Sequence, residues 1–414
     1  MRDEAQAFIA KDNTAGEDPE VRRVAVSALG NHAGTVVVMD PKTGRVYTIV
    51  NQEWALRRGF KPCSTIKLIT GVAGLNEKVI DPVDTTTGYR IDLTDALAYS
   101  NNTYFQQVGG RVGFEKMISY ARDLGLGEKT GINAPSEYPG RLPVLKSGFA
   151  LNRMCSHGDD FEVTAVQLAT LVSAMANGGN LLVPHLPVNA REEDKLKPKV
   201  RRQINVEPDA FQRMVPGMVG AVNYGSGKRA YDPLETVAGK TGTCIGQGGW
   251  LGLFASYAPL ANPRLAVAVI TRGSDGRGHF PAAVAGQIYR DLNRRFGTPT
   301  NLQIAATPET SAPGDKVDPK AAALNEEDKD AAEADAAQSA ETADGAMNGT
   351  TVTEETTQPK TTGTEKAAPR NVKRVMMPIP NRKEESSKPP ASSKSSSKAT
   401  SQTEERPRRV GDQP

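Results

Sequence analysis

Several residue types and patterns are scarce in this chain, and their scarcity excludes whole classes of protein. Only 3 cysteines and 4 histidines occur among 414 residues, without metal-ligand spacing, so we expect no metal site and no disulfide framework. The net charge of +3 gives no broad basic field, and no Gly-rich phosphate loop is present. We therefore expect neither a nucleic-acid partner nor a cofactor.

Long apolar runs are also missing. No stretch approaches the roughly 18 apolar residues that a membrane-spanning helix needs. Residues 1–10 lack the apolar core of a secretory signal peptide. From these patterns we expect a soluble chain, either retained inside the cell or a shortened form of an exported protein.

Aromatic residues are absent from the last part of the chain. Phe296 is the last of them, and Ala, Glu, Asp, Thr, Ser, Lys and Pro dominate the residues that follow. Such a composition cannot bury enough apolar surface to fold alone. We therefore divide the chain into an N-terminal segment (1–23), one folded domain (24–298) and a disordered low-complexity tail (299–414).

The folded part has the apolar patterns of a mixed α and β domain. Two β-branched runs, 34–39 and 45–50, are joined by turn residues and predict a hairpin. Later strands are expected at about 235–241, 250–257 and 264–271, and helices at 19–29, 64–76, within 92–125, at 164–176, 208–222 and 280–295. Residues 1–18 and 189–203 are expected to be irregular. This order predicts an α+β fold, in which a mainly antiparallel five-stranded sheet is flanked by helices and a helical subdomain lies beside it.

One short segment combines the parts of an acyl-transfer site. Ser64 and Lys67 lie three positions apart at the start of an almost wholly apolar helix, so hydroxyl and amine can touch on one face. The Ser64 N–H lies in the first turn, where it has no intrahelical partner and can donate to an oxyanion. A capping serine beside a surface lysine gives the same pattern, so this segment alone decides nothing.

Two further motifs follow in order. They are Ser100-Asn-Asn102 and Lys240-Thr-Gly-Thr243, the second on an expected strand. Each is common alone, but with Ser64-x-x-Lys they form the trio of penicillin-binding proteins and class A β-lactamases. Over roughly residues 24–297 the chain resembles the transpeptidase domain of penicillin-binding proteins.

The resemblance implies a role for each polar residue of the motifs. Ser64 would be the nucleophile that becomes acylated, and Lys67 would be its base. Ser100 would relay a proton to the leaving amine, with Lys67 or Lys240 behind it. Asn102 would hydrogen-bond the amide backbone of the substrate.

The third motif is implied to bind the end of the substrate. Lys240 would supply charge, and Thr241 and Thr243 hydroxyls, to a terminal carboxylate. Gly242 would permit close approach of strand and ligand. The Thr243 N–H would complete the oxyanion hole with that of Ser64.

The function implied is that of a serine D,D-transpeptidase, which crosslinks peptidoglycan stem peptides and is acylated by β-lactams. Such an enzyme acts in the cell envelope or periplasm, where the tail could contact envelope proteins. A D,D-carboxypeptidase would use the same residues with water as acceptor. A serine β-lactamase needs a further carboxylate to activate water, and Glu137 and Glu162 are the nearest candidates. A non-catalytic penicillin-binding sensor or scaffold is the alternative of another class, against which the intact Ser64, Lys67 and Lys240 argue.

The cysteines depart from the family pattern. Cys63 stands where the family has a small residue, and Cys244 directly follows the third motif, so both are expected near the site. We expect buried, inert thiols. A bond from Cys63 to Cys244 or to Cys155 is the alternative, and it would need an oxidising compartment.

Overall fold

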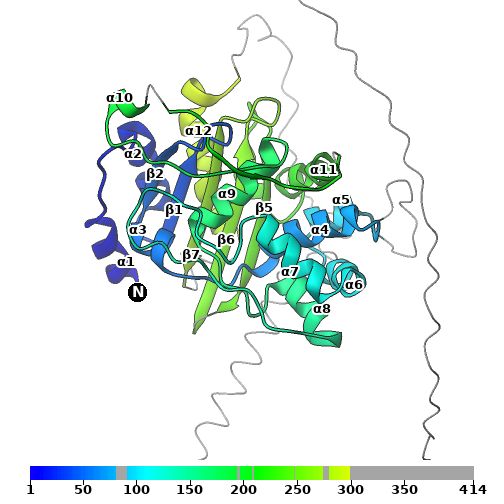
Figure 1. Ribbon diagram of the computed structural model, residues 1–414. Helices are drawn as coiled ribbons and strands as arrows, with labels where there is room; N and C mark the ends of the chain where they lie inside the picture. Colours follow the sequence, from blue (N-terminus) through cyan, green and yellow to red (C-terminus); the bar gives the residue numbers. More distant parts are fainter. Residues whose placement is uncertain (81–90, 194–195, 208, 247, 274–278, 299–414) are drawn as a thin grey trace, which may run out of the picture. The chain divides into compact units, whose positions relative to one another are not determined.

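The computed structural model describes residues 1–298 apart from 81–90, 194–195, 208, 247 and 274–278 (Figure 1). The disordered tail predicted for 299–414 therefore lies outside the described residues. The domain limits at 24 and 298 stay predictions as well.

A five-stranded sheet with the strand order β2-β1-β7-β6-β5 lies at the centre of the fold, and every neighbouring pair is antiparallel. The strands are β1 (Ala33–Met39), β2 (Val46–Val50), β5 (Ala238–Gly246), β6 (Gly249–Ala258) and β7 (Leu265–Arg272). Every residue of β1 and β2 is buried, as in a sheet covered on both faces. The predicted α+β fold with five antiparallel strands is confirmed.

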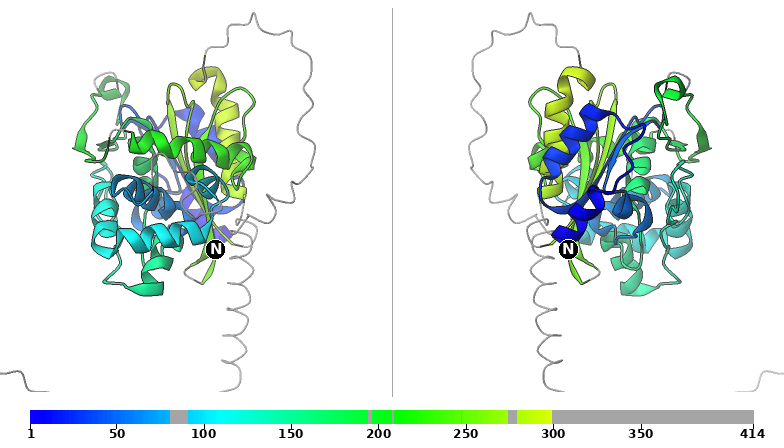
Figure 2. Two further views of the ribbon diagram at one scale, coloured as in Figure 1. Left: turned by 90° about the vertical axis from the view of Figure 1, so that its right-hand side faces the viewer. Right: turned by 90° about the vertical axis from the view of Figure 1, so that its left-hand side faces the viewer.

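Helices cover both faces of this sheet (Figure 2). The helices α2 (Pro19–Leu29) and α12 (Phe280–Phe296) share one apolar cluster with Val36 and Val38 of β1. Val37, between those two valines, belongs instead to the cluster that holds α9 (Ala165–Ala176) and the remaining helices. Alternate residues of a strand point to opposite faces, so this alternation places β1 between two cores.

The helical part stands beside the β5 edge (Figure 1). Its helices are α4 (Lys67–Asn76), α5 (Leu93–Ala98), α6 (Asn102–Val112), α7 (Phe114–Asp123), α8 (Gly148–His157) and α11 (Ala210–Asn223), with 3-10 turns η1 (Cys63–Ile66) and η2 (Lys228–Ala230). Side-chain caps fix the starts of α5 and α6, since Asp92 accepts from Asp95 N and Asn101 from Tyr104 N. The second cap ends the turn that carries Ser100, so the predicted second motif spans the junction of α5 and α6, with Asn102 as the first residue of α6.

Two predictions from the sequence are wrong in detail, and some short helices, among them α3 (Gln52–Arg57) and α8, were not expected. Residues expected to be irregular at the start form α1 (Arg2–Ile9), which buries Ala5. The segment 189–203 holds α10 (Ala190–Glu193) and β4 (Val200–Gln203), which pairs with β3 (Asn180–Leu182). The start of α3 is capped by Asn51. These elements are short and polar, so packing and pairing stabilise them rather than their own sequence pattern.

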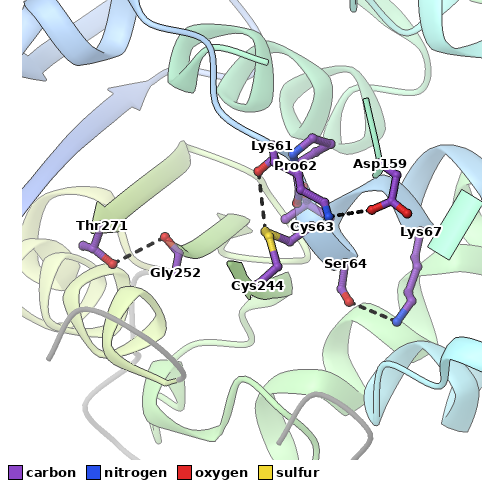
Figure 3. The surroundings of a disulfide bond; sticks show 10 residues. Lys61, Pro62, Cys63, Ser64, Lys67, Asp159, Cys244, Gly252 and Thr271 are labelled. Atoms are coloured by element: carbon purple, nitrogen blue, oxygen red, sulfur yellow. Dashed lines mark hydrogen bonds and ion pairs between the residues drawn. A yellow bond between two sulfur atoms is a disulfide. The ribbon is translucent and has the colours of Figure 1, made fainter. Parts of the chain in front are cut away.

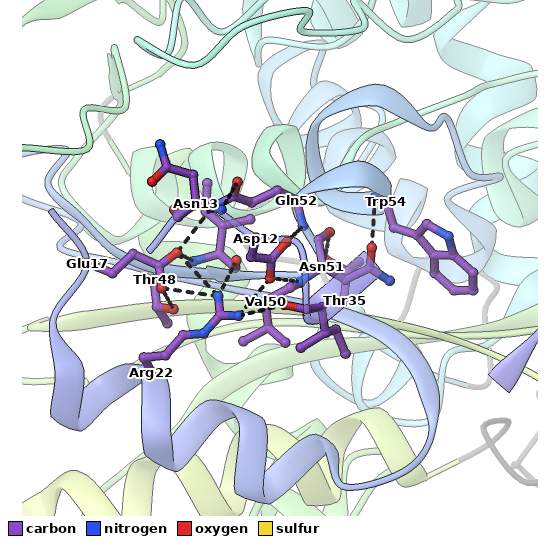
Figure 4. Close-up of polar contacts among 12 residues, drawn as sticks. Asp12, Asn13, Glu17, Arg22, Thr35, Thr48, Val50, Asn51, Gln52 and Trp54 are labelled. Carbon is purple, nitrogen blue, oxygen red and sulfur yellow. Dashed lines mark hydrogen bonds and ion pairs between the residues drawn. The ribbon is translucent and has the colours of Figure 1, made fainter. Parts of the chain in front are cut away.

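A buried polar cluster binds the N-terminal segment to the outer strand β2 (Figure 4). Arg22 on α2 contacts both Asp12 and Glu17 at 2.8 and 3.1 Å. Glu17 also accepts from Thr48 Oγ1 and from the backbone N–H of Ile49. The carboxylates of Asp12 and Glu17, together with the guanidinium of Arg22, therefore hold residues 12–22 against the sheet.

Candidate active site

Ser64 lies in the 3-10 turn η1, directly before α4. Its side chain is almost fully buried, at 4% exposure, and Lys67 is completely buried. As the i, i+3 spacing predicts, Lys67 Nζ lies 3.0 Å from Ser64 Oγ. Pro62 at the turn entry leads into Cys63, whose φ of +47° is unusual for a non-glycine residue. The nucleophile candidate therefore lies on a sharp turn with an amine in contact.

Lys67 brings the first motif into contact with the second. Its Nζ donates to Ser100 Oγ at 3.0 Å, to the Ser100 carbonyl and to Asn102 Oδ1. Ser100 has a φ of +61°, and this left-handed turn between α5 and α6 presents both its oxygens to the amine. The Lys67 amine thus joins the first motif to the second, although Lys67 and Ser100 are 33 positions apart.

Lys240 closes the group from the other side. Lys240 on β5 is fully buried, and its Nζ donates to Ser100 Oγ at 2.8 Å. The Ser100 hydroxyl therefore lies between two amines and joins all three motifs. Such a bridge can pass a proton between groups that do not touch each other.

Strand β5 lies tightly against the nucleophile turn. A Cβ atom on Gly242 would come 3.1 Å from the Pro62 carbonyl and 3.2 Å from Thr65 Cγ2, so a larger residue would push the two apart. Thr241 contacts Ser226 at 2.6 Å, a residue that the sequence did not single out. Thr243 Oγ1 is buried and has no hydrogen-bond partner among the described residues. A buried hydroxyl in that state is costly unless a ligand completes it.

A disulfide joins the first motif to the third, and this corrects the expectation of inert thiols at both positions. Cys63 and Cys244 are bonded, with Cα atoms 5.7 Å apart (Figure 3). The left-handed Cys63 backbone, in a turn that Gly242 approaches closely, brings the two residues together. The sequence separation of 181 left no local signal of the pairing. Cys155 is a free buried thiol, as expected, and burial raises its pKa to about 12.

A cavity of about 480 Å³ lies at the C-terminal end of β5, at Gly246. Its lining includes Lys61, Arg141, Lys146, Phe149, Asp159 and Gly246. Lys61 pairs with Asp159 at 2.5 Å, and Arg153 pairs with the same carboxylate. Burial opposes ionisation of Asp159, but these two cations outweigh it and lower its pKa. The rim of the cavity is therefore charged and internally paired.

The two carboxylates considered as water activators are engaged elsewhere. Glu137 accepts from Thr130 N and Oγ1 and from Gly131 N, which holds a loop together. Glu162 accepts from Tyr138 and pairs with Arg141. Within the described part of the chain, the contacts of both carboxylates are with residues other than Ser64 and Lys67.

Comparison with known proteins decides the family. Residues 34–294, more than half of the chain, match the family described as the penicillin binding protein transpeptidase domain. The chain belongs to this family. The transpeptidase-family match spans all three motifs and both halves of the sheet, from β1 to β7 and α12.

Relatives of this penicillin-binding protein transpeptidase domain occur in Bacillus subtilis and Acinetobacter baumannii. Stage V sporulation protein D of Bacillus subtilis is 26% identical over 313 residues, which cover 62% of this chain and 48% of that protein. Peptidoglycan D,D-transpeptidase MrdA of Acinetobacter baumannii is 26% identical over 351 residues, with 63% and 52% covered. The chain spans about half the length of these curated relatives.

Solved structures share the fold. The transpeptidase domain of penicillin-binding protein 3 from Burkholderia pseudomallei matches with a TM-score of 0.59 at 23% identity, covering 69% of this chain and 97% of that domain. In the part of this chain that is described, no helix combines the length and apolarity needed to span a membrane.

Proposed function

We propose that this chain is a serine D,D-transpeptidase, which is acylated on Ser64 by peptidoglycan stem peptides and by β-lactams. The single observation that supports it most is the chain of contacts from Ser64 through Lys67 and Ser100 to Lys240. Nucleophilic acyl transfer needs an activated hydroxyl, a base in contact with it and a path for the proton.

The first step is attack of Ser64 Oγ on the carbonyl carbon of the penultimate residue, in the last peptide bond of the stem peptide. Lys67 Nζ, at 3.0 Å, takes the hydroxyl proton as the new C–O bond forms. The carbonyl oxygen becomes an oxyanion, to which the backbone N–H groups of Ser64 and Thr243 donate. The disulfide between the residue before Ser64 and the residue after Thr243 keeps these two donors close.

The second step is loss of the terminal D-amino acid as an amine. The proton on Lys67 passes through the Ser100 hydroxyl to the leaving nitrogen, and Lys240 stabilises the same hydroxyl at 2.8 Å. The C–N bond breaks and the acyl-enzyme remains. An acceptor amine then reverses these proton movements and forms the crosslink.

The ligand's terminal carboxylate is assigned to the third motif. Thr243 Oγ1 is buried without a hydrogen-bond partner in the described residues, and a carboxylate would supply one. Lys240 and Thr241 add a positive charge and a second hydroxyl nearby. Asn102, held by Lys67, orients the amide backbone of the peptide.

The disulfide also supports a location. Disulfides persist in oxidising compartments and are rare where thiols are kept reduced. We therefore place the working protein in the cell envelope, which is where peptidoglycan is crosslinked.

The test is a time course of a fluorescent penicillin on the full chain, followed by intact mass and peptide mapping. We expect a stable adduct on the peptide that contains Ser64, and none in Ser64→Ala. Ser173→Ala is the matched control, because Ser173 is a buried serine away from the motifs, whose hydroxyl donates to the Ala169 carbonyl. Rapid release of hydrolysed penicillin would instead indicate a β-lactamase, and unchanged labelling of Ser64→Ala would refute the assignment.

A further inference from the structure

Ser226 joins two walls of the site and belongs to none of the three motifs. It lies between α11 and η2 and is almost fully buried, at 2% exposure. Its backbone N–H donates to the Ala98 carbonyl at 3.0 Å, just ahead of the second motif. Its hydroxyl lies 2.6 Å from Thr241 Oγ1 in the third motif. One residue thus contacts the segments that carry Ser100 and Lys240.

The surrounding chain is built to hold Ser226 there. A Cβ atom on Gly225 would lie 2.1 Å from the Ala98 carbonyl, so only glycine lets the loop approach α5 this closely. On the other side, the Ser226 carbonyl accepts from His279 Nδ1 at 2.6 Å, at the start of α12. The position of Ser226 is therefore fixed by three neighbouring elements.

The hydroxyl of Ser226 has two acceptors and one proton. It reaches Thr241 Oγ1 at 2.6 Å and the Ala98 carbonyl at 3.3 Å. When its proton points to Ala98, the short contact requires Thr241 to donate to Ser226. When its proton points to Thr241, the Thr241 proton is released for another acceptor. The Ala98 carbonyl loses little in that change, because it keeps the N–H of Ser226.

We propose that Ser226 is a positioning residue for recognition of the ligand's carboxylate. Its hydroxyl rotates from Ala98 to Thr241 when the carboxylate arrives, so that Thr241 becomes a donor toward the ligand. Lys240 Nζ, 3.4 Å away, also donates to Thr241 Oγ1. This contact favours the same state, in which the Thr241 oxygen accepts from its protein neighbours and its proton points to the ligand. This role rests on the proposed function, because it concerns the group that binds beside Ser64 during acylation.

The experiment compares two ligands on the full chain: a penicillin with a free carboxylate, and the methyl ester of the same penicillin. Intact mass gives the second-order acylation rate constant of each, and their ratio measures carboxylate selectivity. We expect Ser226→Ala to lower this ratio about tenfold, since a hydrogen bond to a charged group is worth a factor of that order. Ser226→Thr keeps the hydroxyl and is expected to keep the ratio.

Two further variants separate positioning from mere packing. Thr241→Val is expected to lower the ratio as Ser226→Ala does, and the double variant no further, because Ser226 acts through Thr241. If Ser226→Ala does not fold, an unchanged ratio in Thr241→Val still overturns the role of Ser226, because Ser226 acts through Thr241. Ser173→Ala, as the buried-serine control, is expected to leave the ratio unchanged.

The outcomes distinguish the two proposals. Absence of labelling in the unsubstituted protein overturns the proposed function and the role of Ser226 with it. Normal labelling, with equal loss for both ligands in Ser226→Ala or an unchanged ratio in Thr241→Val, overturns only the role of Ser226. A selective loss for the carboxylate ligand, restored in Ser226→Thr, supports it.

Discussion

Two buried polar clusters in this protein are built on opposite plans. In the N-terminal cluster, Arg22 is paired with two carboxylates, Asp12 and Glu17 (Figure 4). In the site, Lys67 donates to neutral oxygens, namely two hydroxyls, a carbonyl and an amide. Both clusters join segments that are far apart in sequence.

The difference separates a structural cluster from the cluster that we propose to be reactive. In an ion pair the proton stays on the cation and the geometry is fixed. Breaking a buried pair leaves an uncompensated charge. Hydroxyl contacts can reverse direction, because each oxygen both donates and accepts. The N-terminal cluster is therefore suited to fastening, and the cluster around Lys67 to moving a proton.

The largest expected effect is at Lys67. Lys67→Ala should lower the rate of penicillin acylation roughly 100- to 10,000-fold, the usual contribution of a positioned base. The midpoint temperature of thermal unfolding should change little in comparison with this loss of acylation rate. A time course of labelling with a fluorescent penicillin measures the acylation rate, and calorimetry measures the unfolding temperature. An acylation rate within threefold of that of the unsubstituted protein would contradict the assignment of Lys67 as the base.

The reverse pattern is expected at Arg22. Arg22→Met should reduce the free energy of unfolding by about 3–5 kcal/mol, because Asp12 and Glu17 lose their cation while buried. The acylation rate of the molecules that remain folded should not change. Urea unfolding gives the first value. Arg57→Met is the matched control, since its exposed pair with Glu53 is worth about 1 kcal/mol or less.

The disulfide should affect both the stability and the acylation rate, because it is a structural crosslink that lies within the candidate site. Cys63→Ala/Cys244→Ala is expected to lower the free energy of unfolding by about 2–4 kcal/mol. The acylation rate should fall too, as the two oxyanion donors separate. Mild reduction of the unsubstituted protein should reproduce both losses, and Cys155→Ala should show neither. Unimpaired acylation after verified reduction would remove the disulfide from the site's machinery.

The smallest effect is a pH dependence of stability carried by two neighbouring carboxyls. Burial raises the pKa of Glu17 despite Ile49 N–H and Arg22, so the folded state holds the proton longer than the unfolded one. Its contribution is full below pH 4.5 and is lost as pH rises through the raised pKa. For Asp18, burial is outweighed by hydrogen bonds from Arg295 and Val21 N–H, and its pKa is lowered. That contribution is present above pH 3.8 and is lost as pH falls.

The opposite pH dependences of Glu17 and Asp18 can be measured separately. In urea unfolding between pH 3 and 7, Glu17→Gln should flatten the decline of stability above pH 4.5. Asp18→Asn should remove part of the decline at the acid end. If Glu17→Gln left the slope above pH 4.5 unaltered, Glu17 would not be the group responsible.

The sequence predicts the strands and long helices well, because their patterns are local. The valine run of β1 and the apolar faces of α9 and α12 are typical of buried elements, and the expected five-stranded sheet was found. The short α1 and the exposed β4 were missed. Their few residues carry no strong periodicity, and only contact with the rest of the chain stabilises them.

The same division holds for the site. The contact of Ser64 with Lys67 follows from helix geometry and could be predicted. The cysteine pair at Cys63 and Cys244, and the place of Ser226 against Thr241, depend on how β5 meets the nucleophile turn. The glycines beside Ser226 are the one local sign that its loop approaches another segment closely.

The disulfide has a mechanical consequence as well. It closes a ring from Cys63 to Cys244, and every residue proposed for the site, from Ser64 to Thr243, lies inside that ring. When the chain is pulled at two points on either side of the ring, tension passes directly from one sulfur atom to the other. The backbone between them bears no load. Force applied to the flanking segments would in this way leave the proposed nucleophile turn at rest.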